Sequence, residues 1–175
     1  MTSHLNLTIR EEIPSDYGAI RRVNDLAFEQ PDEGLMVDAL RRNPRFVPEL
    51  SLVALLDNAV VGHILFFPVR IICVDNDKIS LSLAPLAVHP EHQGEGVGGA
   101  LVREGLEAAR AMGYESVMVM GHPGYYPRFG FRPASGWGIR PPIEAPDEAF
   151  MALELSPGGL GDAAGVLEYP EEYGL

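Results

Sequence analysis

Apolar and polar residues along the first half of the chain follow the two-residue period of β-strands. Residues 7–12 alternate between apolar and polar side chains, as a half-buried strand does. The apolar runs 50–56 and 60–72 flank a short turn at 57–59 and predict a β-hairpin. A run of apolar and small residues at 81–88 predicts a buried strand, which ends before Pro90 because proline has no N–H group for a ladder.

Apolar residues at helical spacing predict three helices among these strands. The first begins near Ser15 or Asp16, and the second begins near Pro31 and ends before Pro44. The third runs from about Ala100 to the stop at Gly113. The apolar run at 116–120 that follows predicts an interior strand.

The last part of the chain is rich in proline and glycine from Trp137 onward. Two short apolar runs, 150–155 and 165–169, are predicted to pair as a closing hairpin, and an exposed hairpin of this kind would suit a homodimer. We find no internal repeat and no linker, so residues 1–175 are predicted to form a single domain with a core at about 7–131 and a C-terminal extension at about 132–175.

A cluster of glycines between the strand at 81–88 and the third helix predicts an anion site. The first turn of a helix has N–H groups without partners and carries partial positive charge. Glycine removes the Cβ atoms that would keep a phosphate away from the main chain. A phosphate or pyrophosphate group is therefore expected here, bound by main chain rather than by lysine. The glycines are Gly94, Gly96, Gly98 and Gly99.

Two motifs in this order resemble the GNAT N-acetyltransferase superfamily. Gln93-Gly94-Glu95-Gly96-Val97-Gly98 is similar to the acetyl-CoA signature Gln/Arg-x-x-Gly-x-Gly/Ala, and Tyr126-Pro127-Arg128-Phe129-Gly130-Phe131 is similar to the downstream Tyr-x-x-x-Gly-Phe segment. The resemblance implies a mixed α/β (α+β) fold with a mostly antiparallel central sheet flanked by helices. It also implies an N-acetyltransferase that uses acetyl-CoA as the acyl donor for a primary amine. The implied cofactor-binding residues are Leu86, Ala87, Val88, Gln93, Gly94, Glu95, Gly96, Val97, Gly98, Gly99 and Ala100.

Tyr126 is the candidate catalytic residue, and Tyr125 is its neighbouring rival. In the resembled family the tyrosine of the second motif often protonates the departing thiolate, and a phenol with an ordinary pKa of about 10 is protonated at neutral pH. The general base is left unassigned, with Glu33 and Asp38 on the second helix as weak candidates. Arg128 is a further candidate for contact with a CoA phosphate.

Composition excludes several partners. A net charge of −12 argues against nucleic acid and anionic membranes, and it mildly favours a cationic acceptor. No apolar run is long enough to cross a bilayer, and Cys73 is the single cysteine, so we expect a cytoplasmic protein without disulfides. His89 and His92 are three residues apart, but Pro90 prevents a helix between them, and no metal site is predicted.

Other classes of protein remain as alternatives. Gly94-x-Gly96-x-x-Gly99 also fits a dinucleotide-binding fingerprint, but five residues separate it from the strand and no acidic residue follows the next strand. A non-catalytic acyl-CoA sensor and an enzyme for longer acyl chains both stay open. The acceptor stays open too, whether a small amine, an antibiotic, a peptide N-terminus or a lysine. Oligomeric state is equally undetermined.

Overall fold

The computed structural model describes residues 6–175, which form a mixed α/β fold with a nine-stranded, mostly antiparallel sheet flanked by helices. This confirms the predicted fold class. The three helices are α1 Tyr17–Phe28, α2 Asp32–Arg41 and α3 Val97–Ala111. The strands are β1 Leu7–Glu11, β2 Ser51–Leu56, β3 Ala59–Cys73, β4 Lys78–Val88, β5 Ser116–Met120, β6 Arg132–Pro133, β7 Ile139–Arg140, β8 Phe150–Glu154 and β9 Gly165–Glu168.

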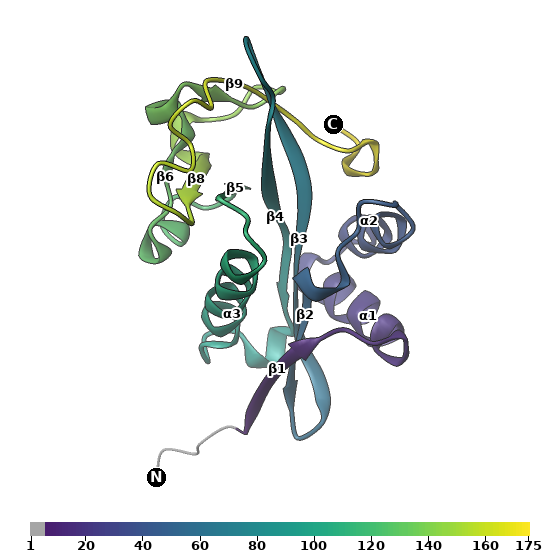
Figure 1. The fold of residues 1–175 in the computed structure, drawn as a ribbon. Coiled ribbons are helices and arrows are strands. Elements are labelled where there is room, and N and C mark those ends of the chain that lie inside the picture. Colours follow the sequence, from purple (N-terminus) through teal and green to yellow (C-terminus); the bar gives the residue numbers. More distant parts are fainter. Residues whose placement is uncertain (1–5) are drawn as a thin grey trace. The chain divides into compact units, whose positions relative to one another are not determined.

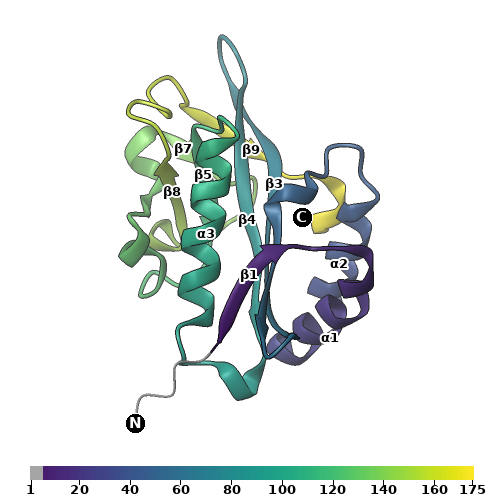
Figure 2. The ribbon, with the colours of Figure 1, turned by 60° about the horizontal axis from the view of Figure 1, so that its bottom comes forward.

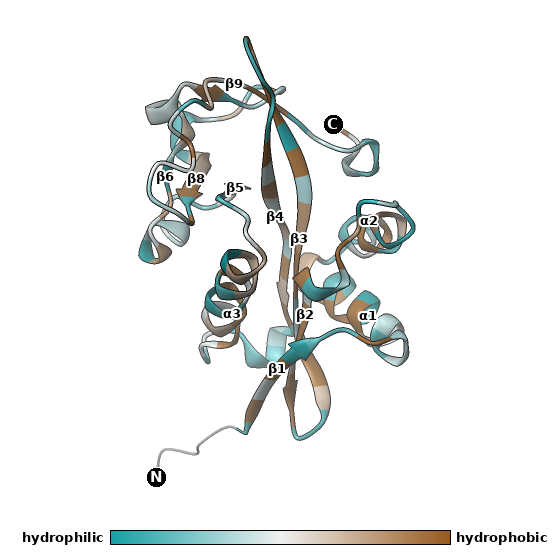
Figure 3. Ribbon diagram, viewed as in Figure 1, coloured by the Kyte–Doolittle hydropathy of each residue, from teal (hydrophilic) through white to brown (hydrophobic). Residues whose placement is uncertain are grey.

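The chain divides into two compact units, and the long strands β3 and β4 contribute to both. The first unit comprises the residues up to Phe66 together with Ala84–Ala108. The second comprises Phe67–Leu83 and Ala109–Leu175. Figure 3 shows why these two strands belong to the interior, because hydrophobic residues follow β3 and β4 along much of their length.

In the first unit, β1, β2 and the first half of β3 pair as an antiparallel meander. Gly62 on β3 leaves room for the side chain of Leu101 from α3, since a Cβ at Gly62 would lie 2.9 Å from its Cδ1 atom. The neighbouring strand position, His63, points to the opposite face and meets Asn24 of α1. Helix α3 therefore covers one face of this part of the sheet, while α1 and α2 lie on the other (Figure 1).

A buried polar cluster joins α1 to the sheet of the first unit. Asn24 Nδ2 donates to the Ile20 carbonyl at 2.9 Å and lies 3.3 Å from His63 Nδ1. Because an amide nitrogen only donates, His63 Nδ1 accepts, and the neutral ring donates through Nε2 to Ser51 Oγ at 3.0 Å. His63 is fully buried, and this burial, aided by the positive charge of Arg41, lowers its pKa to about 3.

We expect this histidine to make the fold sensitive to acid. An unfolded histidine has a pKa of about 6.5, so at lower pH the unfolded chain binds one more proton than the folded chain, until His63 itself is protonated near 3. Stability should therefore be intact above pH 6.5 and fall below it, by up to about 1.4 kcal/mol per pH unit from this group. Urea unfolding between pH 7.5 and 5 measures the slope. His63→Gln should flatten it and the exposed His122→Gln should not, and equal slopes in all three proteins would contradict the assignment.

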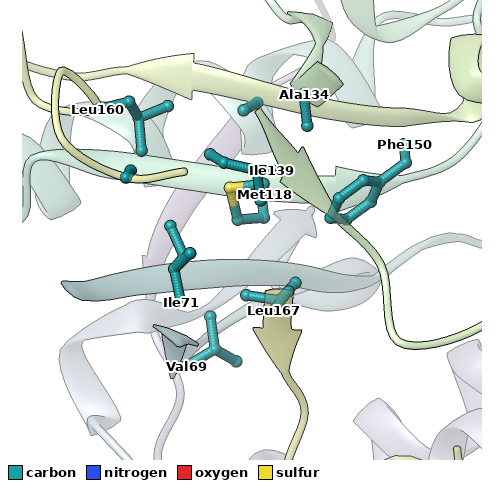
Figure 4. Close-up of a cluster of buried hydrophobic side chains, with 10 residues drawn as sticks. Val69, Ile71, Met118, Ala134, Ile139, Phe150, Leu160 and Leu167 are labelled. Carbon is teal, nitrogen blue, oxygen red and sulfur yellow. The ribbon is translucent and has the colours of Figure 1, made fainter. Parts of the chain in front are cut away.

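In the second unit, β4 and β5 form a parallel pair, as β7 and β9 do, and β5 is an interior strand, as predicted. The β4–β5 pairing joins Leu81 to Val117 and Ser82 to Met118. On its other edge β5 pairs with β8 (Figure 2), and β8 also pairs with β6. Side chains from β3, β5, β7, β8 and β9, including Ile71, Met118 and Phe150, meet in one buried cluster (Figure 4).

The predicted closing hairpin is wrong. Both runs are strands, but β8 pairs with β5 and β6, whereas β9 pairs with the end of β3 and with β7. The connection between them buries Leu160 and Ala163, so it is a packed crossover rather than a turn. A short hairpin would leave these apolar side chains and the edge of β3 without partners. The homodimer stays a prediction, now without the exposed hairpin that suggested it.

Candidate functional site

The glycine-rich segment after β4 is held in place by its own side chains. The His89 N–H donates to the Val61 carbonyl at 2.8 Å, which fixes the point where β4 ends. Gln93 Nε2 donates to the Val88 carbonyl at 3.2 Å, and His92 Nδ1 lies 3.1 Å from Glu95 Oε2. The side chains of Gln93 and Glu95 therefore shape the loop, and its main chain is left to face a ligand.

Two of the loop glycines have backbone angles that other residues avoid. Gly94 has a φ of 79° and Gly96 a φ of 86°, both in the left-handed region. A Cβ atom at either position would meet nothing within 4 Å. Glycine is therefore required here by the backbone conformation, and the space above the loop is open to a ligand.

The first turn of α3 presents three N–H groups beside these glycines. The helical ladder begins with the Ala100 N–H donating to the Gly96 carbonyl at 3.1 Å. The N–H groups of Val97, Gly98 and Gly99 precede it, and no acceptor for them is found among residues 6–175. With the partial positive charge of the helix end, they form the arrangement that binds phosphate groups.

Arg103, which the sequence analysis did not single out, adds a positive charge beside the loop. A Cβ at Gly99 would lie 3.1 Å from Arg103 Nη1, so the guanidinium folds back towards the start of α3 across the bare glycine. The signal in the sequence is the spacing of four residues between Gly99 and Arg103, which places both on one helix face.

The end of β4 extends beyond its pairing with β5. Pairing with β5 stops at Ser82 and Met118, although β4 continues for six residues to Val88. Leu86 and Val88 are half-buried and Ala87 is buried, so the last strand residues keep a face that is partly open.

Tyr126 lies in the second unit, in a short 3₁₀ turn at Tyr126–Phe129, and its ring is packed among aromatic side chains. Its centroid is 5.1 Å from that of Tyr125 and 5.7 Å from that of Phe131. Burial, and to a smaller extent Tyr125, raises the pKa of Tyr126 to about 12, so the phenol is protonated at neutral pH. Its hydroxyl makes no hydrogen bond within the part of the chain that the structure describes.

Gly121 makes room for the Tyr126 ring, a role that the sequence analysis did not predict. A Cβ there would lie 2.5 Å from Tyr126 Cε2, so any other residue would push the tyrosine ring out of place. The glycine ends β5 and reads as an ordinary turn residue in the sequence, which is why its role was not visible.

Arg128 is engaged locally. Its Nε donates to the Tyr125 carbonyl at 2.9 Å and its Nη2 to the Gly124 carbonyl at 3.4 Å. The guanidinium also stacks on the Tyr125 ring, 4.6 Å from its centroid. These contacts fix the turn that carries Tyr126, and we give Arg128 no phosphate-binding role.

The two weak candidates for the general base have other partners. Asp38 accepts from Arg21 at 3.3 Å and from Arg41 at 3.0 Å, so both of its carboxylate oxygens are engaged by arginines. Glu33 Oε1 accepts from Gln30 Nε2 at 2.8 Å. The general base therefore stays unassigned.

Comparison with known proteins identifies the class. The Acetyltransferase (GNAT) family matches residues 17–131. The chain belongs to this family and is an N-acetyltransferase. It is 42% identical over 149 residues to YjhQ, an uncharacterized N-acetyltransferase of Escherichia coli K12, covering 85% of this chain and 82% of the relative. It is 33% identical over 168 residues to YhbS, an uncharacterized N-acetyltransferase of the same strain, covering 95% and 98%.

Solved structures agree with the fold. The crystal structure of E. coli YhbS in complex with CoA has a TM-score of 0.91 and 31% identity, covering 100% of this chain and 96% of that one. A GNAT family acetyltransferase from Brucella melitensis in complex with acetyl-CoA has a TM-score of 0.77 and 36% identity, covering 97% and 99%.

Among the described residues, no helix is long and apolar enough to span a membrane. Within the same residues, no group of three or more His, Cys, Asp or Glu side chains is placed to hold a metal ion.

Proposed function

We propose that this protein transfers the acetyl group of acetyl-CoA directly to a primary amine within a ternary complex. The observation that carries the proposal is the set of three N–H groups at the start of α3, beside two glycines in the left-handed region. Gln93, Gly94, Glu95, Gly96, Val97, Gly98, Gly99 and Ala100 would hold the pyrophosphate, with Arg103 as an added cation. The CoA and acetyl-CoA complexes of the two similar proteins support the choice of ligand.

The pantetheine arm would follow Leu86, Ala87 and Val88, where β4 has left β5. A main-chain N–H group there would donate to the thioester carbonyl. This bond strengthens as the carbonyl oxygen gains charge in the transition state, so it lowers the barrier.

The proposed acetyl transfer forms one bond, breaks one bond and moves two protons. The neutral amine nitrogen attacks the carbonyl carbon, a C–N bond forms, and the C–S bond breaks to release the CoA thiolate. Tyr126 donates the proton that the thiolate takes up, and the proton lost by the amine restores the phenol through solvent. The amine must first lose a proton, because alkyl amines have a pKa of about 10.4. The net charge of −12 would attract the ammonium form to the protein.

Calorimetric titration with acetyl-CoA, followed by a thiol-release assay over a panel of primary amines, tests the proposal. We expect saturable binding and release of one CoA thiol per acetylated amine. Binding without thiol release for any amine would instead identify a non-catalytic acyl-CoA sensor. Preference for NAD or FAD would identify a dinucleotide enzyme, and faster turnover with a longer thioester would change the donor.

The order of events is tested separately. Direct transfer in a ternary complex gives intersecting double-reciprocal plots when amine and acetyl-CoA are both varied. Parallel lines would require a covalent acetyl-enzyme, for which Cys73, the single cysteine, is the obvious thiol. Under direct transfer Cys73 takes no part in the reaction, so Cys73→Ala should leave the rate and the intersecting pattern unchanged.

A further inference from the structure

Glu95 places a negative charge in the loop whose main chain is proposed to bind a phosphate group. It lies between Gly94 and Gly96, the two glycines with left-handed backbone angles. Its Oε2 atom lies 3.1 Å from His92 Nδ1, and 37% of the Glu95 side chain and 30% of the His92 side chain are exposed. An ionised carboxylate only accepts hydrogen bonds, so the Nδ1–H group of His92 donates. His92 therefore fixes where the charge of Glu95 lies.

The His92 ring is held in turn by the residues just before it. Its backbone N–H donates to the His89 carbonyl at 2.8 Å, and the two imidazole rings meet edge to face with centroids 5.9 Å apart. His89 Nδ1 accepts from the Glu91 N–H at 3.1 Å, which fixes the second ring. The donor that meets Glu95 is thus positioned by contacts within one short segment of the first unit.

The start of α3 has no capping side chain next to Glu95. The Gly96 carbonyl accepts the first helical hydrogen bond, from the Ala100 N–H at 3.1 Å, so Gly96 is the N-cap residue. An N-cap side chain usually accepts from the second or third N–H group of the helix, and glycine has no side chain to do so. The N–H groups of residues 97–99 carry the partial positive charge of the helix end and favour a nearby anion. The acidic side chain nearest to them in the sequence is that of Glu95.

Without His92, the Glu95 carboxylate would have reason to turn towards these N–H groups. There it would cap α3 as an acidic residue at a helix start does. It would then occupy the donors that a phosphate group needs, and its charge would oppose a second anion at the same place. The hydrogen bond from His92 keeps the carboxylate in the other position.

We propose that His92 is a positioning residue, whose bond to Glu95 keeps that carboxylate away from the start of α3 and leaves the N–H groups there free for a phosphate group of acetyl-CoA. This inference rests on the proposed function and adds a residue to its cofactor site. His92 acts through Glu95 and takes no part in the transfer of the acetyl group.

The rival explanation is that the contact between His92 and Glu95 only stiffens the loop. A stiffening bond is lost whichever partner is replaced, so both single variants would then weaken acetyl-CoA binding equally. If His92 restrains a competing carboxylate, only the loss of His92 weakens binding, because the loss of the Glu95 charge removes the competitor itself. The direction of the two effects therefore distinguishes the two explanations.

The experiment measures the Kd of acetyl-CoA by calorimetry at neutral pH for wild type, His92→Ala, Glu95→Gln and the double variant. We expect His92→Ala to raise the Kd about three- to fivefold, the scale on which a charge acts at an exposed helix start. Glu95→Gln should leave the Kd at or below the wild-type value. The double variant should bind as tightly as Glu95→Gln alone, because His92 then has no carboxylate to restrain.

His92→Ala combined with Glu91→Gln is the matched control, since it removes an exposed negative charge four residues before Glu95. This protein should keep the weakened binding of His92→Ala. His92→Phe keeps a ring against His89 but has no donor for Glu95, so it should weaken binding as His92→Ala does. It decides the matter, with and without Glu95→Gln, if the alanine variant does not fold in urea unfolding measurements.

Several results would overturn the inference while leaving the proposed function intact. They are an unchanged Kd in the folded His92 variants, an equal weakening in His92→Ala and Glu95→Gln, and a double variant as weak as His92→Ala. Recovery of binding by Glu91→Gln to the same extent as by Glu95→Gln overturns it as well, because the effect would then be one of general charge. A wild type that does not bind acetyl-CoA overturns the proposed function and this inference with it.

Discussion

Replacing Gly96 with alanine is expected to weaken acetyl-CoA binding about tenfold or more, which corresponds to about 1.4 kcal/mol. The φ of 86° at Gly96 is one that an alanine adopts only at a cost of about 1–2 kcal/mol. The loop can relieve this strain by turning away from the left-handed region, and the N–H groups that follow would then point elsewhere. If it does not relax, the new methyl group occupies the space that a phosphate needs beside the main chain. Calorimetric titration of both proteins with acetyl-CoA measures the difference.

Gly158 provides the matched control. Its φ is 75°, and like Gly96 it would accept a Cβ without meeting any atom within 4 Å. Gly158→Ala should therefore lose a similar free energy of unfolding in urea, without any change in the Kd of acetyl-CoA. If both variants lose affinity equally, the effect comes from general destabilisation, and the loop loses its role as the phosphate site.

The glycine loop could be predicted from the sequence because the residues that define it are neighbours in the chain. A strand, a group of glycines and a helix start follow one another within about twenty residues, and the backbone angles of Gly94 and Gly96 agree with the reason for expecting glycine there. The same holds for β2, β3 and β5, whose apolar runs alone define them. Periodicity and turn residues are enough where each element is specified by its own sequence.

Features that depend on distant residues were not visible. The sequence predicts strands at β8 and β9. It does not predict their partners, because β8 pairs with the edge of β5 and β9 with the edge of β3, and both of these strands lie far away in the sequence. The hydrogen bond between Tyr173 and Ser82 spans 91 residues of sequence. Arg103 illustrates an intermediate case, because its relation to Gly99 is local but matters for function only under the proposal that the loop binds an anion.

The hydroxyl of Tyr126 is expected to contribute to turnover far more than to binding. Tyr126→Phe should lower kcat about 100-fold, the lower end of what a positioned acid contributes, and it should leave the Kd of acetyl-CoA within about twofold. The substitution keeps the ring and its packing against Tyr125 and Phe131, so the fold should be unaffected. The loss should appear in kcat because the hydroxyl acts only when the thiolate is forming.

The elevated pKa of Tyr126 also predicts how kcat depends on pH. A phenol with a pKa of about 12 stays protonated up to pH 10, so ionisation of Tyr126 should produce no fall in kcat between pH 7 and 10. It is also a weaker acid than a thiol, whose pKa is about 8.5, so free phenolate should not accumulate. The proton must therefore move as the C–S bond breaks and the amine gives up its own proton, which predicts a solvent isotope effect on kcat in wild type when chemistry limits the rate.

Tyr125→Phe is the control, because the adjacent tyrosine has the same chemistry and was the rival candidate. The substitution keeps the Tyr125 ring, on which the Arg128 guanidinium stacks. A large loss of kcat in Tyr125→Phe with none in Tyr126→Phe would transfer the acid role to Tyr125. If neither variant is slower, solvent protonates the thiolate, and catalysis then depends on the main-chain groups of β4 and the positioning of the two substrates.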